Sequence, residues 1–185
     1  MSSAFDELTQ ALERSRTTLS VQVTELANMA KQTLDANRKI MFCGNGGSAS
    51  EAQHLATELS GRYKNDRIPL AGISLTADSA TITAIGNDYG FDEIFARQVA
   101  ALGNEGDMLI GMSTSGNSRN VIRAIETANE IGIKTVGMTG RSGGLLSQIC
   151  DLTLMVDSDI TARVQEIHLL CGHMMCELID EMLAE

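Results

Sequence analysis

Long hydrophobic runs are absent from this sequence of 185 residues, as are an excess of basic residues and any Cys-x-x-Cys pair. Its apolar runs span only a few residues, whereas a membrane-spanning helix needs about 20. The first residues are neither basic nor followed by a long apolar stretch, so we expect no secretory signal. These absences argue against a membrane protein and favour a cytoplasmic one.

Basic residues are outnumbered, with 14 Lys and Arg against 24 Asp and Glu and a net charge of -10. A nucleic-acid-binding protein usually shows a basic footprint, so we expect no nucleic-acid partner. A small anionic ligand stays possible, because a local pocket can oppose the overall charge. The cysteines are few for this length and indicate reduced, mostly buried thiols; they are Cys43, Cys150, Cys171 and Cys176.

The chain also lacks the common nucleotide-binding fingerprints. GxxxxGK[ST] does not occur, and the segment Gly44-Asn-Gly-Gly-Ser48 does not have the spacing GxGxxG. A dinucleotide-binding Rossmann domain is therefore not favoured. What is present is a globular composition, with 43% hydrophobic and 21% charged residues and 17 glycines that occur in clusters.

Short, nearly all-apolar segments alternate with helical ones along the chain, which predicts an α/β fold with a parallel sheet covered on both faces. We expect a single domain, 1–185, made of an N-terminal helix within 1–35 and an α/β core over 36–185. Asp78 is expected to cap a helix. The expected strands are 39–43, 70–75, 107–112, 134–138 and 152–156, and the expected helices are 3–35, 48–62, one ending near 131, and 161–184.

The first helix carries an apolar stripe that packs either on the core or on another subunit. Its members recur at spacings of three to seven residues: Leu8, Leu12, Leu19, Val23, Leu26, Met29 and Leu34.

Two polar segments follow strands, where ligands of open parallel sheets bind. Glycines in 44–48 allow a ligand to approach the backbone, and the next helix presents free N–H groups to an anion. Ser113-Thr-Ser-Gly-Asn-Ser118 places four hydroxyls and an amide in six residues. That density indicates a phosphate cradle; the alternative is an ordinary turn with a helix N-cap.

Histidines and acids on two helices form a second candidate site. His54 and Glu58 are four residues apart, so they lie on one helical face, either as metal ligands or as an ordinary surface pair. On the last helix Gln165 and His173 are about 80° apart around the axis and can face one pocket. His168 is about 140° from His173, which indicates a core residue.

The segment Gly86-Asn-Asp-Tyr-Gly-Phe91 is expected to be a loop. Its Asn87 and Asp88 either hydrogen-bond sugar hydroxyls or belong to a turn with a cap at Asp88 or Asp92.

Taken together, these segments resemble the sugar isomerase (SIS) domain family from about residue 5 to the end. The Ser113–Ser118 segment is general to SIS domains and specifies only phosphosugar binding. The combination of HxxxE with QEIHxxxxH is more specific. The motifs that carry the resemblance are 43–63, 84–99, 111–125 and 163–173.

The resemblance implies a flavodoxin-like five-stranded parallel sheet and a homotetramer with active sites at subunit interfaces. It implies one zinc ion per subunit, held by His54, Glu58, Gln165 and His173. It also implies contacts to a phosphorylated sugar from Asn45, Gly46, Gly47, Ser48, Asn87, Asp88, Ser113, Thr114, Ser115, Ser118 and Gln165.

Within the family, the resemblance is closest to members that interconvert sedoheptulose 7-phosphate and D-glycero-D-manno-heptose 7-phosphate through an enediol. This reaction is the first step of bacterial ADP-heptose synthesis for the lipopolysaccharide core. Glu58 is the candidate base and His173 the candidate acid. Whether zinc is catalytic, structural or inhibitory stays open, because a tight ligand is not freely a mobile base.

The alternative function is a non-catalytic SIS-domain protein that binds the replication initiator DnaA. Such proteins have replaced the glutamate of HxxxE and the second histidine of the last helix, whereas Glu58 and His173 are present here. This chain departs from the isomerases at the residue before Arg163. That residue is often acidic in the isomerases, whereas it is Ala162 here.

Overall fold

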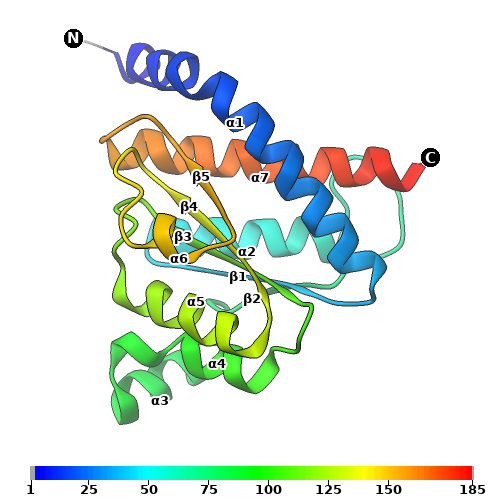
Figure 1. The fold of residues 1–185 in the computed structure, drawn as a ribbon, viewed down its shortest axis with the longest axis vertical. Coiled ribbons are helices and arrows are strands. Elements are labelled where there is room, and N and C mark those ends of the chain that lie inside the picture. Colours follow the sequence, from blue (N-terminus) through cyan, green and yellow to red (C-terminus); the bar gives the residue numbers. More distant parts are fainter. Residues whose placement is uncertain (1–2, 185) are drawn as a thin grey trace.

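A parallel sheet with the strand order β2-β1-β3-β4-β5 forms the centre of the molecule (Figure 1). The computed structural model describes residues 3–184. The order is flavodoxin-like, which confirms the expected fold class. The strands are β1 (Ile40–Gly44), β2 (Gly72–Ser74), β3 (Met108–Ser113), β4 (Lys134–Thr139) and β5 (Leu152–Met155).

Helices cover both faces of this sheet, and Figure 1 shows one group above it and another below. One face carries α1 (Ala4–Asp35), α2 (Gly47–Ser60) and α7 (Thr161–Ala184). The other carries α3 (Ser79–Tyr89), the 3₁₀ helix η1 (Phe91–Glu93), α4 (Ala96–Leu102), α5 (Arg119–Ile131) and α6 (Leu146–Ile149).

Strand β1 illustrates why the sequence builds a two-sided core. Ile40 and Phe42 belong to the cluster beneath α1, α2 and α7, whereas Met41 and Cys43 belong to the cluster on the α5 side. All four side chains are buried. A strand that is apolar at every position fits only the middle of a sheet covered on both faces.

Helix α1 begins at a capping box, in which the Ser3 side chain accepts from the backbone N–H of Asp6 and the Asp6 side chain accepts from that of Ser3. Leu19, Val23 and Leu26 of its apolar stripe are buried in the core, as one of the two interpretations expected. The helix lies across α7 and reaches β5 (Figure 1).

The prediction of a loop over 86–91 was wrong, because Asn87 and Asp88 lie in the last turn of α3. Ile82 and Ile85 pack on the core, and this tertiary contact extends the helix past a glycine. The helix ends at Gly90, whose φ is 96°. Asp88 and Asp92 cap no helix, whereas Asp78 caps α3 as expected by accepting from two backbone N–H groups.

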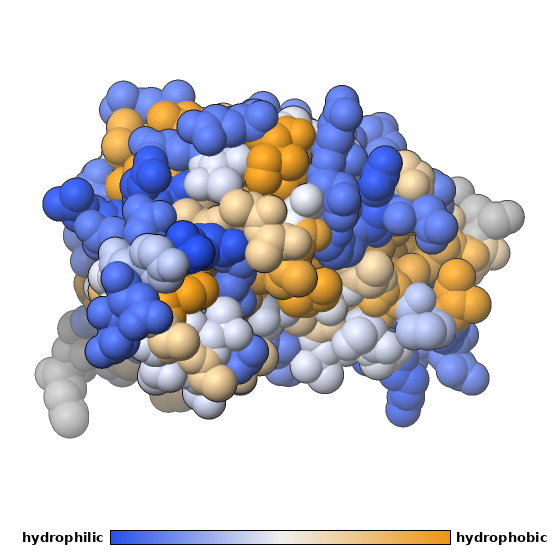
Figure 2. All heavy atoms as spheres, turned by 90° about the horizontal axis from the view of Figure 1, so that it is seen from below, coloured by the Kyte–Doolittle hydropathy of each residue, from blue (hydrophilic) through white to orange (hydrophobic). Residues whose placement is uncertain are grey.

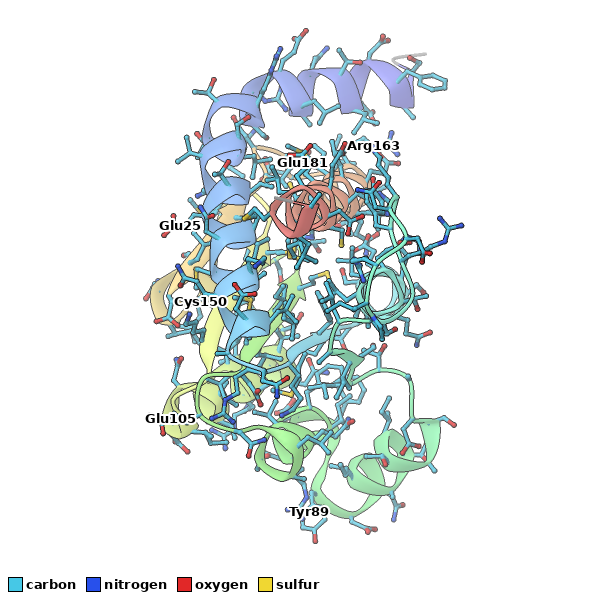
Figure 3. The ribbon with its side chains drawn as sticks, turned by 90° about the vertical axis from the view of Figure 1, so that its right-hand side faces the viewer. Glu25, Tyr89, Glu105, Cys150, Arg163 and Glu181 are labelled. Atoms are coloured by element: carbon cyan, nitrogen blue, oxygen red, sulfur yellow. The ribbon has the colours of Figure 1, made fainter. Side chains whose placement is uncertain are left out.

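The surface at the end of the molecule that carries α3 and α4 is of mixed polarity (Figure 2). Figure 2 looks onto this end and shows hydrophobic residues scattered among hydrophilic ones. Tyr89, which points outward in Figure 3, is stacked by the guanidinium of Arg97 at 3.6 Å. Between residues 3 and 184, no helix combines the length and apolar character that a membrane span requires.

Candidate active site

The loops after β1 and β3 meet at the point where the strand order reverses. Gly44 at the end of β1 is in register with Met112 near the end of β3, so both loops leave the same edge of the sheet. Ligands of open α/β folds bind at this position. The loops are joined by a reciprocal amide pair, in which Asn45 and Asn120 each donate to the other's Oδ1 at 2.9 and 2.8 Å.

Two glycines open the N-terminus of α2. Gly46 has a φ of 56°, a left-handed conformation that favours glycine, and no side chain caps the helix there. A Cβ at Gly47 would lie 2.6 Å from Nε2 of Gln165, so glycine allows Gln165 of α7 to approach this helix end.

The hydroxyls of the Ser113–Ser118 loop are turned toward one another. Ser113 Oγ lies 2.8 Å from Ser118 Oγ and 3.4 Å from Ser115 Oγ. Ser118 occupies the N-cap position of α5, but its side chain makes no capping hydrogen bond. The geometry therefore favours a group of donors available to an anion over an ordinary side-chain-capped turn.

This loop is held against the segment that follows β4. Gly116 has a φ of 67°, and a Cβ at this position would lie 2.0 Å from the carbonyl oxygen of Gly143. The Leu146 N–H donates to the Gly116 carbonyl at 3.1 Å, and the Gly140 N–H donates to the Thr114 carbonyl at 3.0 Å. Only glycine permits such a close backbone contact, which fixes the loop.

A cavity of about 260 Å³ lies between the two loops and the start of α7. A smaller polar cavity of about 200 Å³ adjoins it, where Arg141 is paired with Asp157 and Asp159. Since two carboxylates engage this guanidinium, hydroxyl and backbone donors are the better candidates for holding a phosphate. The larger cavity is lined by Asn45, Gly46, Gly47, Ser48, Met112, Ser113, Thr114, Ser118, Thr161 and Gln165.

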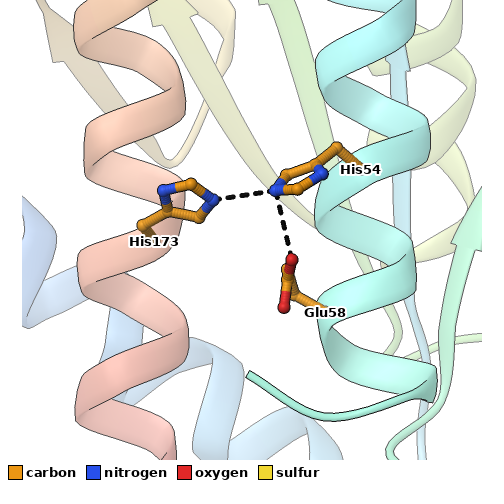
Figure 4. A group of neighbouring side chains, drawn as sticks. All are labelled: His54, Glu58 and His173. Atoms are coloured by element: carbon orange, nitrogen blue, oxygen red, sulfur yellow. Dashed lines mark hydrogen bonds and ion pairs between the residues drawn. The ribbon is translucent and has the colours of Figure 1, made fainter. Parts of the chain in front are cut away.

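Further along α2 and α7, three side chains converge (Figure 4). His54 Nε2 lies 2.8 Å from His173 Nε2 and 3.1 Å from Glu58 Oε1. The potential ligand atoms all lie within 4.8 Å of one another. Two imidazole nitrogens and a carboxylate oxygen are a donor set that zinc accepts, so these residues fit a bound metal ion.

The imidazole of His173 sits in a constrained environment. The Tyr63 ring stacks on it, with centroids 5.4 Å apart. Desolvation and the neighbouring His54 lower the pKa of His173, although Glu58 opposes this shift. A neutral imidazole can bind a metal or exchange a proton near neutral pH.

Most of the expected site residues come together in one chain, but two do not. Ser115 lines the adjoining polar cavity, and Gln165 lines the larger one beside Gly47. Asn87 and Asp88 line neither cavity. They hydrogen-bond to each other on α3, and Asp88 faces a separate hollow between α3 and α4.

His168 is a core residue, as its angle on the helix predicted. It is fully buried, its Nε2 lies 3.1 Å from the Thr139 carbonyl oxygen, and burial lowers its pKa to about 4.

Glu51 was not anticipated from the sequence. It is buried on α2, one of its carboxyl oxygens has no hydrogen-bond partner, and burial raises its pKa to about 7 despite a hydrogen bond from Ser48. A signal was present, because Glu51 lies three residues after Ser48 and three before His54, on the same side of the helix.

Known proteins with similar sequences identify the family of this chain. The sequence pattern of the SIS domain family matches residues 5–140, and the chain belongs to this family. Among curated relatives, the phosphoheptose isomerase of Aliarcobacter butzleri (strain RM4018) is 52% identical over 167 residues, which cover 90% of this chain and 88% of the relative. That of Helicobacter pylori (strain P12) is 50% identical over 171 residues, 92% and 89% of the two chains.

The solved structure of the phosphoheptose isomerase from Neisseria gonorrhoeae superposes with a TM-score of 0.91 at 44% identity and covers 96% of this chain and 95% of its own. Within the SIS domain family, the chain therefore belongs to the family of phosphoheptose isomerases and is an enzyme. These relatives and the presence of Glu58 beside His173 leave the non-catalytic alternative without support.

Proposed function

We propose that the chain interconverts sedoheptulose 7-phosphate and D-glycero-D-manno-heptose 7-phosphate through an enediol. The observation that carries this proposal is the pair of Glu58 and His173, whose reactive atoms lie within 4.8 Å on two helices that also border the hydroxyl-lined cavity. The reaction would form the first step of bacterial ADP-heptose synthesis.

The site has the extent that a heptose phosphate needs. Gly47 and Ser48 border the cavity, and His54 lies seven residues after Gly47, which corresponds to about 10 Å along α2. In the substrate the phosphate and the reacting carbons are at opposite ends. We therefore assign the phosphate to the 113–118 loop and carbons 1 and 2 to the His54–Glu58–His173 triad.

Glu58 acts as the base and His173 as the acid in this assignment. Starting from the ketose, Glu58 takes a proton from carbon 1, the C–H electrons form the carbon–carbon double bond of the enediol, and His173 protonates the oxygen on carbon 2. Glu58 then returns its proton to carbon 2, while the oxygen on carbon 1 gives its proton to His173, which restores the acid, and becomes the aldehyde oxygen. No proton is gained or lost overall.

A zinc ion, one per subunit, would be held by His54, Glu58, Gln165 and His173. Such an ion would supply polarisation of the carbonyl and hydroxyl oxygens of the substrate. The donor set supports this assignment, since two nitrogens and one carboxylate oxygen already converge.

The active assembly is proposed to be a homotetramer. A largely apolar groove of about 520 Å³ runs between α1 and α7, and Leu170 within it is 41% exposed. Burial of this groove by other copies would stabilise an oligomer. Asn87 and Asp88 would then contact substrate in a neighbouring subunit's site, which accounts for their distance from the cavity of their own chain.

The test is an isomerase assay with purified protein and sedoheptulose 7-phosphate, with added zinc or after chelation. We expect conversion to the aldoheptose phosphate, and the chelator arm determines whether metal contributes. Absence of turnover in folded, zinc-loaded protein contradicts the proposed function.

A further inference from the structure

A buried ion pair joins the segment after α2 to α7, beyond the triad. Arg67 Nε donates to Asp180 Oδ1 at 2.7 Å, and the two side chains are only 7% and 2% exposed. Burying two charges costs several kcal/mol each unless hydrogen bonds satisfy the remaining donors and acceptors. The partners of this pair therefore indicate its role.

On one side, the Arg67 guanidinium binds the C-terminal end of α2. Nη2 donates to the carbonyl oxygen of Glu58 at 2.8 Å, and Nη1 donates to that of Leu59 at 2.9 Å. The last carbonyls of a helix lack partners within the helix, and a positive charge is favourable there. The guanidinium thus holds the backbone of the proposed catalytic base directly.

On the other side, Asp180 binds the chain that leaves α2. Its Oδ2 accepts from the backbone N–H groups of Lys64 and Asn65, both at 3.2 Å. Burial would raise the pKa of Asp180, but the hydrogen bonds from Arg67 and these backbone groups outweigh it and the pKa is lowered. The carboxylate therefore stays ionised and connects α7 to this segment.

The pair acts on two helices that also approach each other closely nearer the cavity. A Cβ at Gly47 would lie 2.6 Å from Nε2 of Gln165, and a Cβ at Gly172 would lie 2.4 Å from Cδ2 of Leu55. His173 follows Gly172 immediately, and Asp180 is seven residues later, about two helical turns. The ion pair therefore adds the contact that fixes the two helices beyond Glu58 and His173.

We propose that Arg67 and Asp180 are positioning residues that hold Glu58 and His54 of α2 in register with His173 of α7 and so determine the affinity of the triad for a metal ion. This inference rests on the metal site of the proposed function. Replacement of a buried ion pair by apolar residues of similar volume is often neutral or stabilising. The attraction between the two charges is therefore not the reason for the pair, whose hydrogen bonds to the backbone on both sides fix the geometry.

The decisive variant is Arg67→Met with Asp180→Leu, because it removes the pair without leaving one charge buried alone. We expect it to fold with a lowered unfolding midpoint, because the Glu58 and Leu59 carbonyls and the Lys64 and Asn65 N–H groups lose these hydrogen-bond partners. We expect Co²⁺ affinity, followed by the visible absorption of the bound ion, to fall about 10–100-fold. The kcat should fall while the KM stays nearly unchanged, because the phosphate loop lies at the other end of the site.

A matched control exists between the residues that precede β1 and β3, where Lys39 is paired with the buried Asp107. Lys39→Met with Asp107→Leu removes a comparable pair from the amino ends of β1 and β3. It should leave Co²⁺ affinity unchanged. Equal affinity in the wild type and the Arg67→Met/Asp180→Leu variant, with unchanged kcat, overturns the proposal.

Two further measurements keep the proposal testable. If the double variant does not fold, Arg67→Lys keeps the charge but loses the planar fork, and it should lower Co²⁺ affinity in a folded protein. In metal-free protein, nuclear Overhauser contacts between the His54 and His173 rings should be present in the wild type and weakened in either variant. If the wild type binds no Co²⁺, the metal assignment fails, whereas unchanged ring contacts in the variants refute positioning by the pair.

Discussion

Glu58 and His173 are brought together by residues that take no part in chemistry. The His54 and His173 rings have centroids 5.1 Å apart. They can approach because Gly172 has no side chain, which leaves room for Leu55 of α2 against α7. The stacked Tyr63 ring limits rotation of the His173 imidazole. Such preorganisation lowers the cost of reaching the reactive geometry.

Glu58→Gln is expected to leave the fold intact and to reduce turnover about 100- to 10,000-fold, because the amide cannot accept the substrate proton. The measurement is kcat with sedoheptulose 7-phosphate, together with the unfolding midpoint. Glu126→Gln is the control, since Glu126 is a partly exposed acid paired with Arg123 on α5, on the other face of the sheet. Near-wild-type turnover of Glu58→Gln would exclude Glu58 as the base.

His168 makes stability depend on pH on the acid side. Burial lowers its pKa from 6.5 to about 4, so between these values the unfolded chain binds a proton that the folded chain does not. The free energy of unfolding therefore falls as the pH drops through this range. His168→Gln keeps a donor for the Thr139 carbonyl but cannot titrate.

When the pH is lowered from 7 to 4, the free energy of unfolding should fall less for the His168→Gln variant than for the wild type. The difference between the two decreases should be up to about 3 kcal/mol. Urea unfolding at pH 7 and near pH 4 checks this, with the two proteins compared at each pH. Identical pH dependence would mean that His168 is not protected from protonation.

At the scale of elements, the groups proposed for binding and for chemistry come from different parts of the chain. The loop between β3 and α5 supplies the hydroxyls, whereas α2 and α7 supply the proposed acid–base pair. Both sets were predictable from the sequence, because strand–loop–helix alternation places loops at one sheet edge and a four-residue spacing places His54 beside Glu58.

Other features were not predictable, because they depend on contacts distant in sequence. Helix α3 continues past Gly86 owing to the packing of Ile82 and Ile85 on the core. The approach of His54 to His173 joins residues 119 positions apart, and no local pattern encodes that distance.

Ser113→Ala with Ser115→Ala is expected to raise the KM about 100-fold or more with little change in kcat, since hydrogen bonds to a charged group contribute about 1.5–3 kcal/mol each. Steady-state kinetics measures both constants. Thr127→Ala on α5 is the control, because its hydroxyl bonds only to the carbonyl of Arg123 within its own helix. An unchanged KM would show that these hydroxyls do not bind the phosphate.

At the scale of the whole molecule, only part of the surface of α1 packs against its own chain. Its inner residues complete the core, and its outer side borders the groove with α7. In Figure 3, α1 crosses the end of the molecule opposite Tyr89, with Arg163 beside it. Arg163 donates to the Ala4 carbonyl at 2.8 Å, which secures the first turn.

Leu170→Glu is expected to shift the sedimentation coefficient toward smaller species, because a charge in the apolar groove opposes burial between subunits. Activity should fall with it if sites are shared between subunits. Leu145→Glu is the control, since Leu145 is 38% exposed beside α6, on the opposite side of the sheet. Unchanged sedimentation of the Leu170→Glu variant would exclude this groove as the interface.

The separation of the serine loop from the helical acid–base pair has an evolutionary consequence. The loop is held by Gly116 and the segment after β4, and none of these contacts involves Glu58 or His173. Under the proposed function, a descendant that loses Glu58 and His173 therefore inherits an intact serine loop for a phosphorylated sugar. Ligand recognition and catalysis can be lost or gained independently on this scaffold, which allows one ancestral fold to yield both enzymes and sensors.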